Sequence, residues 1–247
     1  MNRVLLCLVV LAAISCSTSA PSDTREVRRD DGGAGSAPAA PNASAGSSSA
    51  PADAPELRRE TPAPGLPRIV ALGDSLTAGL GLPREDAYPA LLQRKLREQG
   101  FELDVVNAGV SGDTSADGLR RASWALEGDV RLLILALGAN DGLRGLPPGQ
   151  MKANLQSIIH RARQRAIPVL LVGMEAPPNF GEQYAGAFRQ VFRDLAQENK
   201  ITLVPFLLEG VAGVPDLNQA DGIHPTTAGA ARIADHLWPA VKTMIGK

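Results

Sequence analysis

One serine of the sequence stands where a chain can present a nucleophile. Residues 69–72 are an apolar run of Ile, Val, Ala and Leu, and Gly73, Asp74 and Ser75 follow at once. Such a run predicts a buried strand, and chemistry in parallel sheets gathers just beyond the strand ends. Two interpretations of Ser75 stay open on these residues alone. It either caps a helix by accepting backbone N–H bonds, or it presents a nucleophilic hydroxyl.

A base for that hydroxyl is available in a second loop. A serine hydroxyl is a weak nucleophile, and histidine is the usual base because it titrates near neutral pH. Among the three histidines, His160 and His236 fall in helical patterns, whereas His224 stands in the loop DGIHP. Asp221 precedes His224 by three residues, so one turn can present both, and a carboxylate there would orient the imidazole. A plain surface turn before a helix is the alternative.

The tetrahedral intermediate of acyl transfer also needs hydrogen-bond donors, and losing one donor typically costs about 10²–10³ in rate. Three candidates follow strand-like segments: the amide of Asn140 in GANDG, a glycine N–H in NAGVSGDT, and the backbone N–H of Ser75. Glycine suits this task because it has no Cβ to block close approach. Each loop also reads as an ordinary turn or helix cap.

The elements that must position these loops alternate along the chain. Strand-like runs occupy residues 69–72, 103–107, 130–137, 168–172 and 201–204. Helical patterns lie between them and after the last, at residues 88–99, 117–126, 151–165, around 188–195 and around 233–241. Such alternation predicts βαβ units, hence one three-layer α/β/α domain built on a parallel sheet. The four polar loops then meet at one edge of that sheet.

Four blocks, GDSL, NAGVSGDTSADG, LGANDG and DGIHP, resemble those of the SGNH (GDSL) hydrolases in order and spacing. Residues 68 to about 241 are most similar to the bacterial periplasmic thioesterase I, lysophospholipase and arylesterase group. The resemblance implies a flavodoxin-like α/β/α sandwich with five parallel strands. It also implies a serine hydrolase that acts on aryl esters, acyl thioesters or lysophospholipids through an acyl-enzyme, without a cofactor or metal.

The resemblance assigns roles residue by residue. Ser75 matches the nucleophile, His224 the general base and Asp221 its orienting carboxylate. Gly112 and Asn140 match the oxyanion donors, joined by the backbone N–H of Ser75. The chain departs from close relatives at position 139, where Ala replaces a frequent glycine and leaves the placement of the neighbouring amide open.

Two further loops are candidates for holding the acyl group. Leu143 and Leu146 follow Asn140 in a glycine- and proline-containing segment, as an apolar lip would. Pro178 and Phe180 follow the fourth strand-like run. The alternative is that these side chains only pack on the core.

The N-terminal segment predicts export and a flexible connection to the folded domain. Residues 4–14 form an apolar run after Arg3, too short to span a bilayer but typical of a signal peptide. The segment ending at Cys16 resembles a lipobox, which predicts a lipid anchor on Cys16 in a periplasmic or cell-surface lipoprotein. Cleavage after Ala20 would instead release a soluble periplasmic or secreted protein. Residues 17–67, rich in Ala, Pro, Ser and Gly, predict a disordered tether to a domain at 68–247.

Composition and charge limit the functional classes that remain possible for the protein. The formal net charge of −1 provides no basic field for nucleic acid, and we expect a monomer that acts on small acyl substrates. Asp221 and His224 have no further ligand nearby to complete a metal site. Two alternatives remain: a carbohydrate O-deacetylase of the same superfamily, and a catalytically silent lipid-binding lipoprotein. The first would need an aromatic sugar platform, yet Trp124 and Trp238 both fall away from the four blocks.

Overall fold

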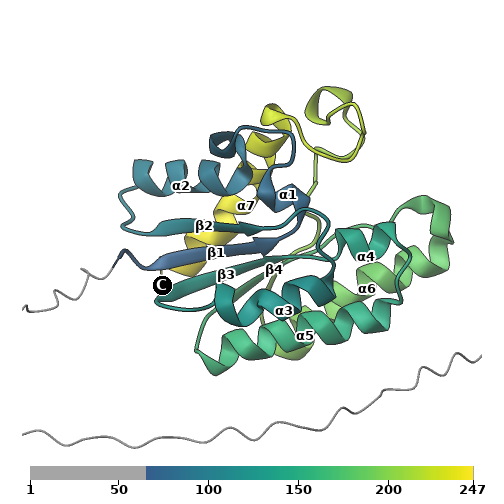
Figure 1. Ribbon diagram of the computed structural model, residues 1–247, viewed down its shortest axis with the longest axis horizontal. Helices are drawn as coiled ribbons and strands as arrows, with labels where there is room; N and C mark the ends of the chain where they lie inside the picture. Colours follow the sequence, from purple (N-terminus) through teal and green to yellow (C-terminus); the bar gives the residue numbers. More distant parts are fainter. Residues whose placement is uncertain (1–64, 247) are drawn as a thin grey trace, which may run out of the picture. The chain divides into compact units, whose positions relative to one another are not determined.

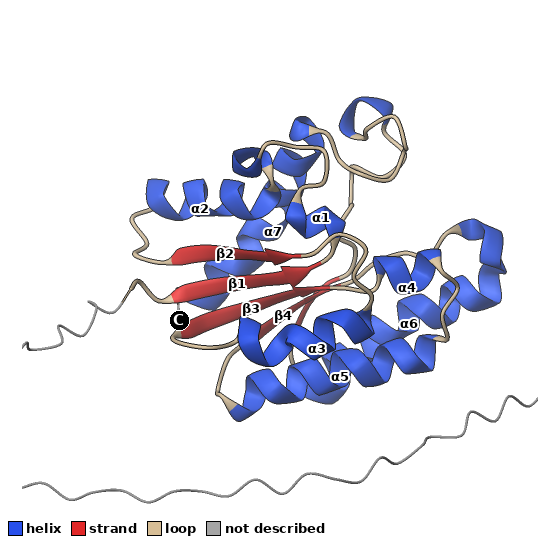
Figure 2. Cartoon of the chain, viewed as in Figure 1, coloured by secondary structure: helices blue, strands red, loops and turns tan. Residues whose placement is uncertain are grey.

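The five apolar runs of the sequence form five parallel strands. A computed structural model describes residues 65–246. The strands lie side by side in the order β2-β1-β3-β4-β5 and point the same way (Figure 2). The predicted signal segment, with Cys16, and residues 17–64 of the predicted tether lie outside the described residues. The strands are β1 (Arg68–Gly73), β2 (Asp104–Gly109), β3 (Val130–Ala136), β4 (Val169–Val172) and β5 (Thr202–Val204).

Helices cover both faces of this sheet, which confirms the predicted three-layer α/β/α fold (Figure 1). One layer holds α2 (Tyr88–Glu98) and α7 (Thr227–Ile245), which pack on each other. The opposite layer holds α3 (Ser115–Ala125), α5 (Pro148–Gln164) and α6 (Gly181–Asn199). None of the helices in residues 65–246 has the length and apolar character needed to cross a bilayer.

The burial of the central strands explains why their sequences are continuously apolar. In β3 only Arg131 is exposed, because side chains on both faces meet a helical layer. Helices show the complementary pattern, in which one apolar stripe is buried and the other face is polar. On α6 the buried stripe includes Phe188, Phe192 and Leu195, which match the spacing seen in the sequence.

The connections place a crevice at the carboxyl ends of β1 and β3. These strands are neighbours, but the chain leaves β1 toward α2 on one face and leaves β3 toward α5 on the other. In open parallel sheets such a reversal separates the loops and leaves room for a ligand.

Two short helices at this edge depart from the sequence prediction. Residues Ser75–Ala78 form α1, and Ala139–Leu143 form α4, although neither range is among the helical patterns found in the sequence. Helices of four or five residues span too little chain for an apolar period to appear. Three 3₁₀ turns, Arg84–Asp86, Pro178–Phe180 and Pro215–Leu217, complete the described elements.

Candidate active site

The turn after β1 presents Ser75 without using it as a cap. Asp74 is the N-cap of α1, and its Oδ1 accepts the Leu76 N–H at 3.0 Å. Ser75 is therefore the first residue of the helix, and its hydroxyl is free for other contacts. Gly73 permits the sharp turn, because a Cβ there would collide with the Thr77 hydroxyl and the Ala136 carbonyl.

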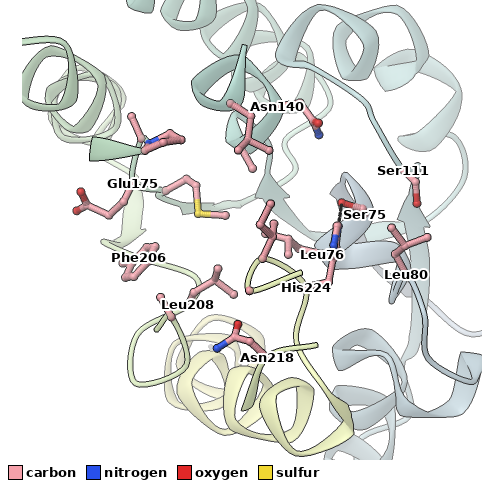
Figure 3. Close-up of a pocket in the computed structure, with 18 of the residues that line it drawn as sticks. Ser75, Leu76, Leu80, Ser111, Asn140, Glu175, Phe206, Leu208, Asn218 and His224 are labelled. Atoms are coloured by element: carbon pink, nitrogen blue, oxygen red, sulfur yellow. Dashed lines mark hydrogen bonds between the residues drawn. The ribbon is translucent and has the colours of Figure 1, made fainter. Parts of the chain in front are cut away.

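A hydrogen-bonded series joins Ser75, His224 and Asp221. His224 Nε2 lies 2.9 Å from Ser75 Oγ, and His224 Nδ1 lies 2.6 Å from Asp221 Oδ2. Figure 3 shows the imidazole facing the hydroxyl across the dashed line. The structure thus brings together three side chains that the sequence separates by up to 149 residues.

The same turn fixes the protonation state of Asp221. Its Oδ1 accepts the backbone N–H groups of Ile223 at 2.9 Å and His224 at 3.0 Å. The backbone N–H of His224, then its ring, then the Ile223 N–H hold the pKa of Asp221 well below its usual range. An ionised Asp221 accepts a hydrogen bond from Nδ1–H, which leaves the Nε2 lone pair directed at the serine hydroxyl.

Gln219, which the sequence analysis did not single out, anchors the histidine loop. Its backbone N–H donates to the His224 carbonyl at 2.7 Å. Its side-chain Nε2 donates to the carbonyls of Leu80 at 2.7 Å and Pro225 at 2.8 Å. The residue therefore ties the loop that carries His224 to the segment after α1. No local pattern marks such a contact between residues 139 positions apart.

The predicted oxyanion donors line one cavity together with His224. Ser75, Gly112, Asn140 and His224 all line it. Gly112 has φ +85°, in the left-handed region that favours glycine. Asn140 Nδ2 donates one N–H to the Asp113 carbonyl at 3.0 Å, which orients the amide and leaves its second N–H available.

A buried carboxylate that the sequence analysis did not assign holds α4 in place. Asp141 is 2% exposed, and it accepts hydrogen bonds from Ser115 N at 2.7 Å and Ser115 Oγ at 2.6 Å. Asn154 Nδ2 donates to the same hydroxyl at 3.0 Å. Because these contacts fix α4 against the N-terminus of α3, they also fix the neighbouring Asn140 (helix positions in Figure 1).

Asp74 is a further titratable group beside the triad of Ser75, His224 and Asp221. It is 1% exposed, and burial raises its pKa to about 6, although the Leu76 N–H and the nearby His224 oppose the shift. A carboxyl in a low-dielectric site disfavours its charged form. This carboxyl therefore titrates near neutral pH rather than in acid.

The cavity beside the triad has a volume of about 510 Å³ and a largely apolar wall. Leu143 and Pro178 line it, as predicted. In Figure 3, Leu80 and Ser111 lie on one side of Ser75, and Phe206 and Leu208 lie on the other. The sequence analysis proposed none of the other apolar residues of the wall as substrate contacts: Leu76, Leu80, Ala139, Met174, Ala176, Pro177, Phe206, Leu208, Ala212 and Ile223.

Leu146 and Phe180, the other two residues that the sequence suggested for holding the acyl group, are not among the residues that line this cavity. The Phe180 ring packs on Tyr184, with centroids 5.2 Å apart, and occupies the space above Gly145. The carbonyl of Leu146 accepts the Tyr184 hydroxyl at 2.8 Å. Both residues therefore contact Tyr184, which joins α6 to the loop after α4. Within residues 65–246 no three His, Cys, Asp or Glu side chains converge to hold a metal ion.

Comparison with known proteins agrees with this geometry. A profile of the GDSL-like Lipase/Acylhydrolase family matches residues 71–232. The chain is 45% identical to "Esterase TesA" of Pseudomonas aeruginosa over 178 residues, covering 72% of this chain and 89% of the relative. It is 37% identical to the "Arylesterase" of Vibrio mimicus, covering 68% of this chain and 84% of the relative.

A third relative is the "Thioesterase 1/protease 1/lysophospholipase L1" of Escherichia coli K12, at 36% identity over 72% of this chain and 84% of the relative. Among solved structures, "Crystal Structure of TesA" superposes with a TM-score of 0.69 at 45% identity, covering 72% of this chain and 99% of the other.

Proposed function

The chain belongs to the GDSL-like lipase/acylhydrolase family, and from this premise we propose that it hydrolyses carboxylic esters and thioesters through an acyl-enzyme on Ser75. The observation that carries the proposal is the 2.9 Å contact between His224 Nε2 and Ser75 Oγ. It lies within the range expected of a nucleophile and its base.

The reaction follows in two balanced halves. In the first, Ser75 Oγ bonds to the substrate carbonyl carbon while His224 Nε2 takes the hydroxyl proton. The oxyanion is stabilised by N–H groups of Gly112, Asn140 and Ser75. The alcohol or thiol then leaves with the proton from Nε2, and the acyl group stays on Ser75. In the second half, water loses a proton to Nε2 and attacks the acyl carbon. The bond between that carbon and Ser75 Oγ then breaks, Nε2 returns the proton to Oγ, and the carboxylic acid leaves.

The cavity wall favours an apolar acyl or aryl group. Leu80, Leu143 and Ile223 line the cavity and are 42–47% exposed, so they extend its apolar surface to the mouth. Substrates of this kind include aryl esters, acyl thioesters and lysophospholipids, the classes named for the three relatives. Removal of such an acyl chain from water is favourable in proportion to its buried area.

The two alternatives receive less support. A carbohydrate deacetylase would benefit from an exposed aromatic platform, yet neither Trp124 nor Trp238 belongs to the cavity wall. A silent lipid-binding protein would not require a hydroxyl, an imidazole and a carboxylate in hydrogen-bonded series.

Export and anchoring are a separate part of the proposal. The apolar residues 4–14 and the lipobox-like segment ending at Cys16 support a lipoprotein held at a bacterial membrane. Mass spectrometry of the mature N-terminal peptide tests this. A diacylglyceryl cysteine at Cys16 supports the anchor, and an unmodified N-terminus after Ala20 contradicts it.

The catalytic part is tested by turnover of p-nitrophenyl esters, acyl-CoA, lysophospholipid and acetylated sugars by the wild type and by Ser75→Ala. We expect activity on the first three classes and its loss in the variant, with an unchanged melting temperature. Ester turnover that persists in Ser75→Ala, or activity on acetylated sugars alone, would overturn the proposal.

A further inference from the structure

Arg121 connects three segments at the active-site edge of the sheet. It lies within α3, and its side chain is only 19% exposed. Its Nε donates to Asp113 Oδ2 at 2.6 Å, Nη1 to the Ala108 carbonyl at 2.6 Å and Nη2 to the Gly73 carbonyl at 2.7 Å. One guanidinium therefore satisfies a carboxylate and two backbone carbonyls.

Each acceptor belongs to a part of the catalytic apparatus. Gly73 ends β1, two residues before the nucleophile, and Ala108 lies near the end of β2. Asp113 directly follows Gly112, and its carbonyl accepts the Asn140 amide at 3.0 Å. The guanidinium thus connects the strand that presents Ser75 with the loop that contains Gly112 and that accepts the Asn140 amide.

Only arginine can make this set of contacts. Its guanidinium is planar and presents five N–H groups in a fixed fork, whereas lysine offers a single point of charge on a flexible stem. Three acceptors in different directions around one group require such a fork. Asp113, with a side chain 13% exposed, is also a poorly solvated carboxylate, so it depends on a charged partner.

We propose that Arg121 is a positioning residue that sets the separation between Ser75 and the Gly112 and Asn140 donors; the inference rests on the function proposed above. The oxyanion donors must lie within about 0.5 Å of their productive positions for full stabilisation of the transition state. Ground-state binding depends on the apolar cavity wall, to which Arg121 does not contribute.

The test compares Arg121→Lys with Arg120→Lys, a matched change at the next position of the same helix. The Arg120 side chain is 73% exposed, and in the part of the chain that the structure describes it pairs only with Asp117. We expect kcat for p-nitrophenyl butyrate to fall about ten- to hundredfold in Arg121→Lys, with KM changed less than about threefold. Arg120→Lys should keep wild-type kcat. Each kcat is calculated per active site, and the active sites are counted by titration to completion with a phosphonate. A smaller folded fraction in a variant then does not lower its kcat.

Rescue of Arg121→Ala by a small guanidinium compound distinguishes a positioning role from a purely structural one. Added guanidinium at tens of millimolar should restore part of its kcat saturably, whereas urea, which has a similar shape but no charge, should not. Asp113→Asn, which keeps a neutral acceptor, should lose less kcat than Arg121→Lys and serves if the arginine variants fail to fold.

Unchanged kcat per active site in Arg121→Lys would overturn the inference, as would equal rescue by urea and guanidinium or an unaffected Asp113→Asn. If wild-type turnover depends on Ser75, those results remove the role of Arg121 alone. If the wild type shows no Ser75-dependent turnover, the proposed function fails and this inference with it.

Discussion

Replacing Asp221 by Asn should be more damaging than removing its side chain altogether. Asp221 Oδ1 accepts two backbone N–H groups, from Ile223 and His224, while Oδ2 accepts His224 Nδ1. An asparagine must turn its oxygen toward the two N–H groups, because its NH₂ cannot accept them. The NH₂ then faces Nδ1 and requires that nitrogen to be an acceptor, so the ring proton moves to Nε2.

That tautomer cannot take the proton of Ser75, since Nε2 already carries one. A carboxylate-to-amide change of this kind costs about 10⁴ in kcat in a serine protease triad. In Asp221→Ala the imidazole is free to adopt either tautomer. Because the Asp221 side chain is 45% exposed, water can replace its oxygen at Nδ1. We therefore expect a smaller loss of kcat in Asp221→Ala than in Asp221→Asn.

The assay is steady-state hydrolysis of p-nitrophenyl butyrate at one fixed pH for all variants. Asp129→Asn serves as the control, because Asp129 directly precedes β3 at the far end of the strands. Within residues 65–246 its carboxylate pairs only with exposed Arg131. Equal or higher activity in Asp221→Asn than in Asp221→Ala would refute the reasoning about tautomers.

Three further outcomes follow from the site. The free energy of unfolding should depend on pH differently in Asp74→Asn and in the wild type. The value of the variant minus that of the wild type should increase by up to about 3 kcal/mol between about pH 4 and pH 7.5. The reason is that the pKa of Asp74, raised to about 6, makes wild-type stability full in acid and partly lost as pH rises through that value; a constant difference in urea denaturation would contradict it. Asn140→Ala should lower kcat about 10²–10³ with little change in KM, and a pure KM effect would count against the oxyanion role. Leu143→Arg should raise KM for p-nitrophenyl octanoate but not for the acetate, whereas Leu146→Arg should change neither, because only Leu143 lines the cavity; equal effects on both esters would contradict this.

The sheet was predictable because its strands are buried on both faces. Residues 130–137 are almost continuously apolar, and β3 occupies Val130–Ala136. The short helix α4 was not predictable in the same way, since five residues show no apolar period. The capping role beside Ser75 also stayed ambiguous in the sequence, because both Asp and Ser are good caps; the structure gives it to Asp74.

The parts of the site that could not be predicted from the sequence depend on contacts between residues far apart in the chain. The sequence suggests Leu146 and Phe180 as substrate contacts because they lie near Asn140 and near a strand end, but Tyr184 on α6 contacts both. The guanidinium of Arg121 reaches an acceptor 48 residues away. Nothing in the local composition around Arg121 records such a partner, so only the folded chain reveals it.

Catalysis at this site requires that the hydroxyl of Ser75 be activated by its neighbours. Incubation of the protein with a fluorophosphonate, followed by peptide mapping, measures that activation. We expect one phosphonyl group per chain, located on Ser75 and formed far more slowly in His224→Ala. Labelling at another residue, or an undiminished rate in the histidine variant, would show that His224 does not activate Ser75.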